Sequence, residues 1–77
     1  MNPAAATIRQ AFAPLWLCLL AACRVELARG KLDPLRTVAL AVDRFEAACA
    51  LPLARRDVYV GLALRAYPAA HRQIRGL

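Results

Sequence analysis

Apolar positions recur with a helical period through most of the chain, and residues 34–50 show this best. The apolar positions there are Leu35, Val38, Val42, Phe45 and Cys49. They are separated by three and four positions in turn, which places them along one seam of a helix. The polar residues of the segment fall on the other side. The spacing therefore predicts an amphipathic helix over residues 34–50.

Residues 3–29 predict a second helix, and this one is apolar almost all round. Asn2 and Pro3 form a start signal, since Asn caps helices well and Pro is favoured at the first helical position. Gly30 stands where a helix commonly stops. Pro14 lies inside the pattern and leaves two alternatives open: it kinks one long helix, or it begins a new one.

The two helices are joined by a connector of only a few residues. Asp33 and Pro34 repeat the start signal of a cap followed by proline. A short connector between two helices predicts an antiparallel helical hairpin over about residues 3–50. We expect its two arms to pack along one shared seam. The candidate seam residues are Trp16, Leu20, Leu27, Val38, Val42 and Phe45.

The remaining segment, about residues 53–75, predicts a third and shorter helix. Its main part is expected to run from Leu53 to Ala66, with Asp57 as a possible cap. Tyr67 and Pro68 suggest a break, followed by a last short helix or a frayed tail. The whole chain, residues 1–77, is then a single small all-α domain.

The over-apolar first helix carries the main functional expectation. A helix that is apolar on every side has to be buried on several sides, and a hairpin partner covers only one of them. Apolar surface left over usually marks an interaction site. We therefore expect a protein partner, in a hetero-complex or a homo-oligomer. The candidate partner-binding residues are Leu15, Leu17, Leu19 and Leu40. Leu19→Asp is expected to abolish the partner complex and leave the chain helical.

Charge adds an alternative at the C-terminal end. The chain carries a formal net charge of +6, and residues 52–77 hold five Arg against one Asp. The candidates for contact with an anion are Arg55, Arg56 and Arg65, with two tyrosines and His71 nearby. A nucleic-acid-binding or inhibitor protein is therefore an alternative, although the arginines do not follow one helical face in a helix-turn-helix unit.

Composition disfavours enzymes. The chain contains no Ser and one His, and its acidic residues look like caps or surface ion pairs, so no set of nucleophile, base and orienting residue can be assembled. Cys18, Cys23 and Cys49 have neither disulfide-framework nor zinc-site spacing. We expect no catalytic residues, no metal and no cofactor.

A second alternative rests on Cys23. The run Leu20-Ala21-Ala22-Cys23 follows an apolar stretch and looks like the lipobox of a bacterial lipoprotein signal, which would attach lipid at Cys23 and anchor the protein to a membrane. The apolar stretch is too short to span a bilayer. We expect an unprocessed cytoplasmic protein.

The run Ala21-Ala22-Cys23-Arg24-Val25-Glu26-Leu27-Ala28-Arg29-Gly30-Lys31-Leu32-Asp33-Pro34 resembles the turn region of the small co-chaperones of type III secretion needle subunits. The resemblance covers about residues 17–51. It implies a cytoplasmic helical hairpin that binds a TPR-like partner chaperone and, with it, keeps the needle subunit unpolymerised. A non-enzymatic helical adaptor of this kind is the function we expect from the sequence.

Overall fold

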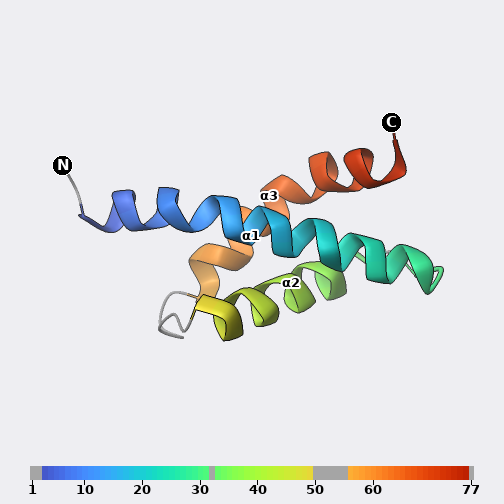
Figure 1. Cartoon of the computed structure of the whole chain (residues 1–77), viewed down its shortest axis with the longest axis horizontal. Coiled ribbons are helices and arrows are strands. Elements are labelled where there is room, and N and C mark those ends of the chain that lie inside the picture. The colour runs from blue at the N-terminus through green and yellow to red at the C-terminus, as the bar shows by residue number, and fades with distance from the viewer. Residues whose placement is uncertain (1–2, 32, 50–55, 77) are drawn as a thin grey trace.

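A computed structural model gives the protein three helices and, within its described residues, no strand. It describes the backbone of residues 3–31, 33–49 and 56–76, and the side chains of 12–31, 33–48 and 56–76. The helices are α1 (Pro3–Ala28), α2 (Pro34–Cys49) and α3 (Arg56–Arg75). The predicted all-α hairpin with a third helix is therefore confirmed (Figure 1).

Gly30 ends the first helix as the sequence predicts. Its φ is +73°, a conformation that costs glycine little and other residues more. The Lys31 amide donates to the Glu26 carbonyl at 3.0 Å, and the Gly30 amide donates to the Leu27 carbonyl at 3.0 Å. These two bonds form a Schellman motif, which satisfies carbonyls that the helix end would otherwise leave unpaired.

Asp33 begins the second helix, again as predicted. Its carboxylate Oδ1 accepts a hydrogen bond from the Leu35 amide at 3.0 Å. Its backbone carbonyl accepts from the Thr37 amide at 2.9 Å, which is the first bond of the helical ladder. Pro34 occupies the first helical position, where a missing amide hydrogen costs nothing.

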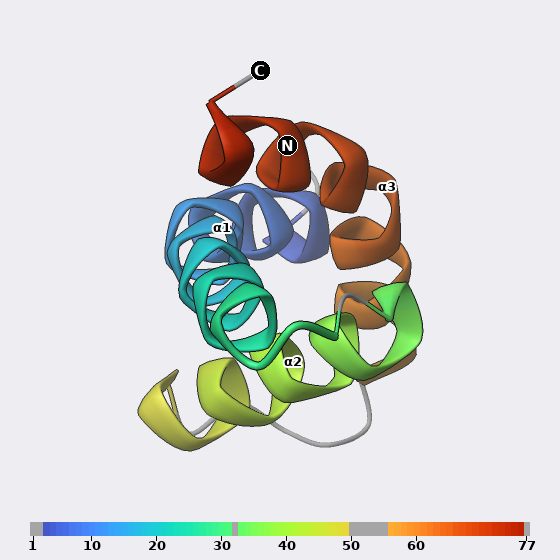
Figure 2. The ribbon, with the colours of Figure 1, turned by 90° about the vertical axis from the view of Figure 1, so that its right-hand side faces the viewer.

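The three helices surround one core. α2 returns antiparallel to α1, and α3 then crosses back in the direction of α1 (Figure 1). Each helix packs against the other two, and the view along the long axis shows them arranged around a common centre (Figure 2). The buried apolar residues are Leu15, Leu19, Leu20, Ala22 and Cys23 of α1, Val38, Ala41, Val42 and Phe45 of α2, and Tyr59, Ala63 and Ala70 of α3.

The third helix corrects the sequence-based expectation. α3 is one helix of 20 residues, longer than the 16-residue α2, and it continues through Tyr67 and Pro68. A proline removes one ladder bond. Here Pro68 is exposed, while Ala63 before it and Ala70 after it are both buried, so packing on either side holds the helix together. Asp57 lies in the first turn, and the predicted start at Leu53 falls outside the described residues.

Pro14 also lies inside a helix, which resolves the two alternatives left by the sequence. α1 is a single helix from Pro3 to Ala28 with Pro14 in its interior. The carbonyl of Gln10 therefore has no amide four residues on to accept from. Pro14 does not begin a new helix.

The predicted seam of the hairpin is buried in its middle, but the residues predicted for its closed end, beside the turn, are exposed. Leu20, Val38, Val42 and Phe45 are buried as expected, and Trp16 is half-buried against the core. Leu27 is 37% exposed and Leu35 is 70% exposed, so these two assignments are wrong. Both residues stand next to the turn, where the helices end and less of the bundle covers them. The side chain of Cys49 lies outside the described set.

Tyr59→Phe is expected to leave stability unchanged or raise it by about 1 kcal/mol. Tyr59 is 1% exposed, and its hydroxyl has no hydrogen-bond partner in the described part of the chain. Removing an unsatisfied buried hydroxyl removes a desolvation cost and keeps the ring. Urea unfolding followed by circular dichroism measures the change. A loss of more than about 1 kcal/mol would show that the hydroxyl makes a stabilising bond.

Candidate functional site

Two of the four predicted partner-binding residues lie in the core. Leu15 is 2% exposed and Leu19 is fully buried, so the prediction that they form a docking surface is wrong. The sequence did not show how much of α1 the third helix covers, and α3 packs directly against it. Leu40 is half-buried against the core. Leu17, at 65% exposure, is the one predicted docking residue that is open to solvent.

The first part of α1 extends beyond the bundle. At 1.5 Å per residue the 26-residue α1 is about 39 Å long and the 16-residue α2 about 24 Å. Neither α2 nor α3 accompanies α1 at its N-terminal end (Figure 1). Among the described side chains of α1, the first in the core is Leu15, and Phe12 is 43% exposed. We call residues 3–14 of α1 the N-terminal arm.

Five further large apolar residues are exposed among the described side chains. They are Leu17, Leu27, Leu35, Val58 and Leu64. They are spread over all three helices, with Leu27 and Leu35 both beside the hairpin turn, and some exposed apolar residues are normal on a protein surface. The N-terminal arm differs from these positions because its backbone extends past the ends of α2 and α3 (Figure 1).

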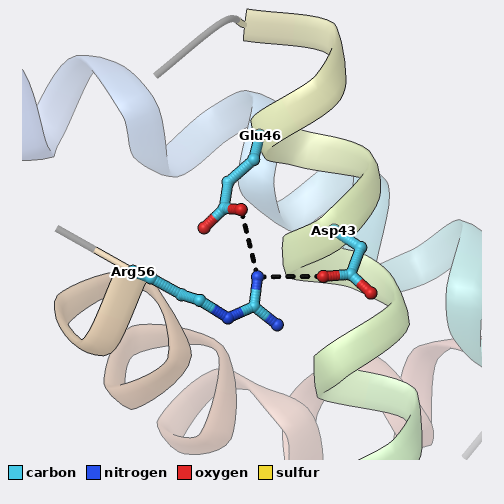
Figure 3. A network of polar contacts seen from close by, with 3 residues as sticks. All are labelled: Asp43, Glu46 and Arg56. Carbon is cyan, nitrogen blue, oxygen red and sulfur yellow. Dashed lines mark hydrogen bonds and ion pairs between the residues drawn. The ribbon is translucent and has the colours of Figure 1, made fainter. Parts of the chain in front are cut away.

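Arg56 ties α3 to α2 through two carboxylates. Its Nη1 lies 2.9 Å from Asp43 Oδ1 and 3.1 Å from Glu46 Oε2 (Figure 3). Desolvation works to lower the pKa of Arg56, but the hydrogen bond to Asp43 and the charges of both carboxylates together raise it. The sequence correctly indicated ion pairs for Asp43 and Glu46. Their shared partner in the structure, Arg56, belongs to the third helix.

The three residues predicted to contact an anion do not share one environment in the structure. Arg56 is engaged with two carboxylates, so its assignment to an external anion is wrong. Arg65 is exposed on α3, and Arg55 lies outside the described residues. Arg72 and Arg75 were not among the candidates, yet both are exposed on the same helix as Arg65. Because a break was expected at Pro68, the sequence did not indicate that Arg65, Arg72 and Arg75 lie on one continuous helix.

The buried thiol and the aromatic pair offer little reactivity. Burial raises the pKa of Cys23, so its thiol stays protonated and poorly nucleophilic at neutral pH. Partial burial, with smaller effects of Cys23 and Asp33, raises the pKa of Tyr67. The rings of Tyr67 and His71 stack with centroids 5.8 Å apart.

Within the described residues, no three His, Cys, Asp or Glu side chains group together as metal ligands would. No described helix combines the length and apolar character that crossing a bilayer requires. Comparison with protein-family models, curated proteins and solved structures finds no match to this chain.

Proposed function

We propose that this chain is a non-enzymatic adaptor that binds another protein through the N-terminal arm. The observation that carries the proposal is the extension of α1 past the ends of its two neighbours (Figure 1). A helical segment of this length has little stability in water without tertiary contacts. A groove on a partner protein would supply those contacts, in the helix-in-groove mode of recognition.

Phe12 is the described side chain best placed to anchor such a complex. It lies in the arm, it is aromatic, and 43% of it is exposed. Aromatic residues dominate the binding energy of protein interfaces when they fill a pocket. Leu15 and Leu19, which the sequence suggested as docking residues, are buried and hold the part of α1 that follows the arm in the core.

The resemblance of residues 21–34 to the needle-subunit co-chaperones gives the proposal a specific form. In that form the partner is a TPR-like chaperone, and its concave helical surface receives the arm. The complex then acts in the cytoplasm and keeps a needle subunit unpolymerised. A homo-oligomer built through the same arm is the alternative within the protein-binding class.

The lipoprotein alternative fits the fold poorly. Cleavage before Cys23 would remove Leu15, Leu19, Leu20 and Ala22, all of which lie in the core. Cys23 itself is fully buried in the middle of the bundle. The shortened chain would have to build its core without most of α1.

Phe12→Asp is expected to weaken partner binding by about thirtyfold, the loss typical of an interface hot spot. The chain would be tagged at its C-terminus and captured from its host, and intact masses would identify what co-purifies. The affinity of the purified partner for each variant would then be measured. Leu35→Asp is the matched control, because Leu35 is exposed in the first turn of α2, beside the hairpin turn and far from the arm along α1.

The proposal predicts a stoichiometric protein partner. This partner should bind the wild type and Leu35→Asp with equal affinity and bind Phe12→Asp much more weakly. Capture of no protein, or equal binding by all three chains, would contradict it. A complex containing only copies of the 8.4 kDa chain would assign the arm to self-association and reject the co-chaperone form.

A further inference from the structure

The solvent side of α3 carries three arginines in register. Arg65, Arg72 and Arg75 are all exposed, at spacings of seven and three residues. These spacings put the three residues on one side of a helix, about 10 Å and 4.5 Å apart along its axis. The register exists because α3 continues through Pro68. We call these three residues the arginine face.

The charge of the arginine face is not neutralised within the described part of the protein. Asp43 and Glu46 bind Arg56, and Glu26 lies 3.8 Å from Arg29. The carboxylate of Asp33 caps α2. The fifth acid, Asp57, is in the first turn of α3, about 12 Å along the axis from Arg65. The acids that could offset the arginines are therefore used elsewhere or lie too far away.

A pair of stacked rings borders this face. Tyr67 and His71 lie one turn apart on α3, and their rings are nearly parallel, at 17°. Both residues are partly exposed. His71 immediately precedes Arg72 and lies one turn before Arg75, so a planar group lies beside the charged groups.

We propose that the arginine face binds single-stranded nucleic acid. Guanidinium groups match phosphate oxygens in charge and geometry, and successive phosphates can be met by a row of arginines. Proteins that bind single strands combine such a basic track with rings on which bases stack, and His71 is the ring that supplies this second component. This surface is separate from the N-terminal arm.

Other polyanions fit the face less well. A helix that lies on a membrane needs a continuous exposed apolar side, whereas the described part of α3 exposes just two large apolar residues, Val58 and Leu64. An acidic polypeptide would use the arginines and gain nothing from the adjoining rings. Competition by each of these two ligands distinguishes them from a nucleic-acid strand.

The probe is a fluorescein-labelled oligo(dT) strand of about 12 nucleotides, followed by anisotropy from about 50 to 200 mM NaCl. Three phosphate contacts to a single strand predict a slope of about −2 for log affinity against log salt. Arg65→Gln/Arg72→Gln/Arg75→Gln should lose at least about tenfold in affinity, and the slope should approach zero. Arg72→Gln alone should reduce the slope by about 0.7.

The matched control is Arg24→Gln/Arg36→Gln/Arg44→Gln. It removes three exposed arginines from α1 and α2, so the net charge falls equally while the arginine face stays intact. Its affinity should stay within about threefold of the wild type. Phe12→Asp should leave oligo(dT) binding unchanged, which separates this proposal from the adaptor function.

His71→Ala tests the stacking component. The substitution should lower the affinity for oligo(dT) at least about fivefold. The affinity for an abasic strand of equal length should stay unchanged. The proposal is overturned if the wild type shows no saturable binding, or if the control triple variant loses as much affinity as the arginine-face variant. The proposal would also be overturned if polyglutamate or anionic lipid vesicles displaced the labelled strand as well as unlabelled oligo(dT) does.

Discussion

Leu19→Asp is expected to unfold the protein, and not to leave it helical as the sequence alone suggested. Leu19 is fully buried between α1 and the helices that cover it. The change removes a core leucine and introduces a carboxylate that has no partner there, at a combined cost of at least about 4 kcal/mol. A domain of this size has a total stability of roughly 4–11 kcal/mol. Circular dichroism and urea unfolding at neutral pH should show little or no cooperative native state.

Leu17→Asp is the control for this experiment. Leu17 lies two residues away on the same helix and is 65% exposed, so the same chemical change should alter the free energy of unfolding by less than about 0.5 kcal/mol. If Leu19→Asp remained as stable as Leu17→Asp, the packing of α1 described above would be wrong.

Phe45→Ala is expected to lower the free energy of unfolding by about 3–5 kcal/mol. Phe45 is 1% exposed, and its ring meets that of Tyr59 edge to face at a centroid distance of 5.1 Å. The substitution leaves a cavity where α2 meets α3 and removes a favourable aromatic contact. Urea unfolding measures this loss. The urea concentration at the midpoint should fall, while the dependence of the unfolding free energy on urea concentration should stay the same.

Phe12→Ala provides the comparison for the same chemical change. Phe12 is 43% exposed in the N-terminal arm, and its truncation should cost less than about 1 kcal/mol. Equal losses at the two positions would contradict the assignment of Phe45 to the core and Phe12 to the surface.

Local signals predicted the elements of the fold well. Gly30 and Asp33 set the ends of the hairpin turn through bonds that depend on neighbouring residues alone. The strict spacing of Val38, Val42 and Phe45 likewise predicts a buried seam that the structure shows. Each of these inferences uses contacts within one helix or between adjacent helices.

The candidate site was predicted less well, because it depends on how the third helix lies. Whether Leu15 and Leu19 face a partner or the core is decided by the packing of α3, which sequence periodicity does not give. The engagement of Arg56 depends on the approach of α3 to α2. The register of Arg65 with Arg72 depends on a helix that tolerates Pro68.

Hydrogen–deuterium exchange of the chain, alone and in its captured complex, tests the adaptor proposal most directly. Amides of the N-terminal arm should exchange much faster in the free chain than those around Leu19 and Val42. In the complex, the arm should become protected, while exchange on α3 stays unchanged. Protection of other segments with the arm unaltered would contradict the claim that this part of α1 is the docking element.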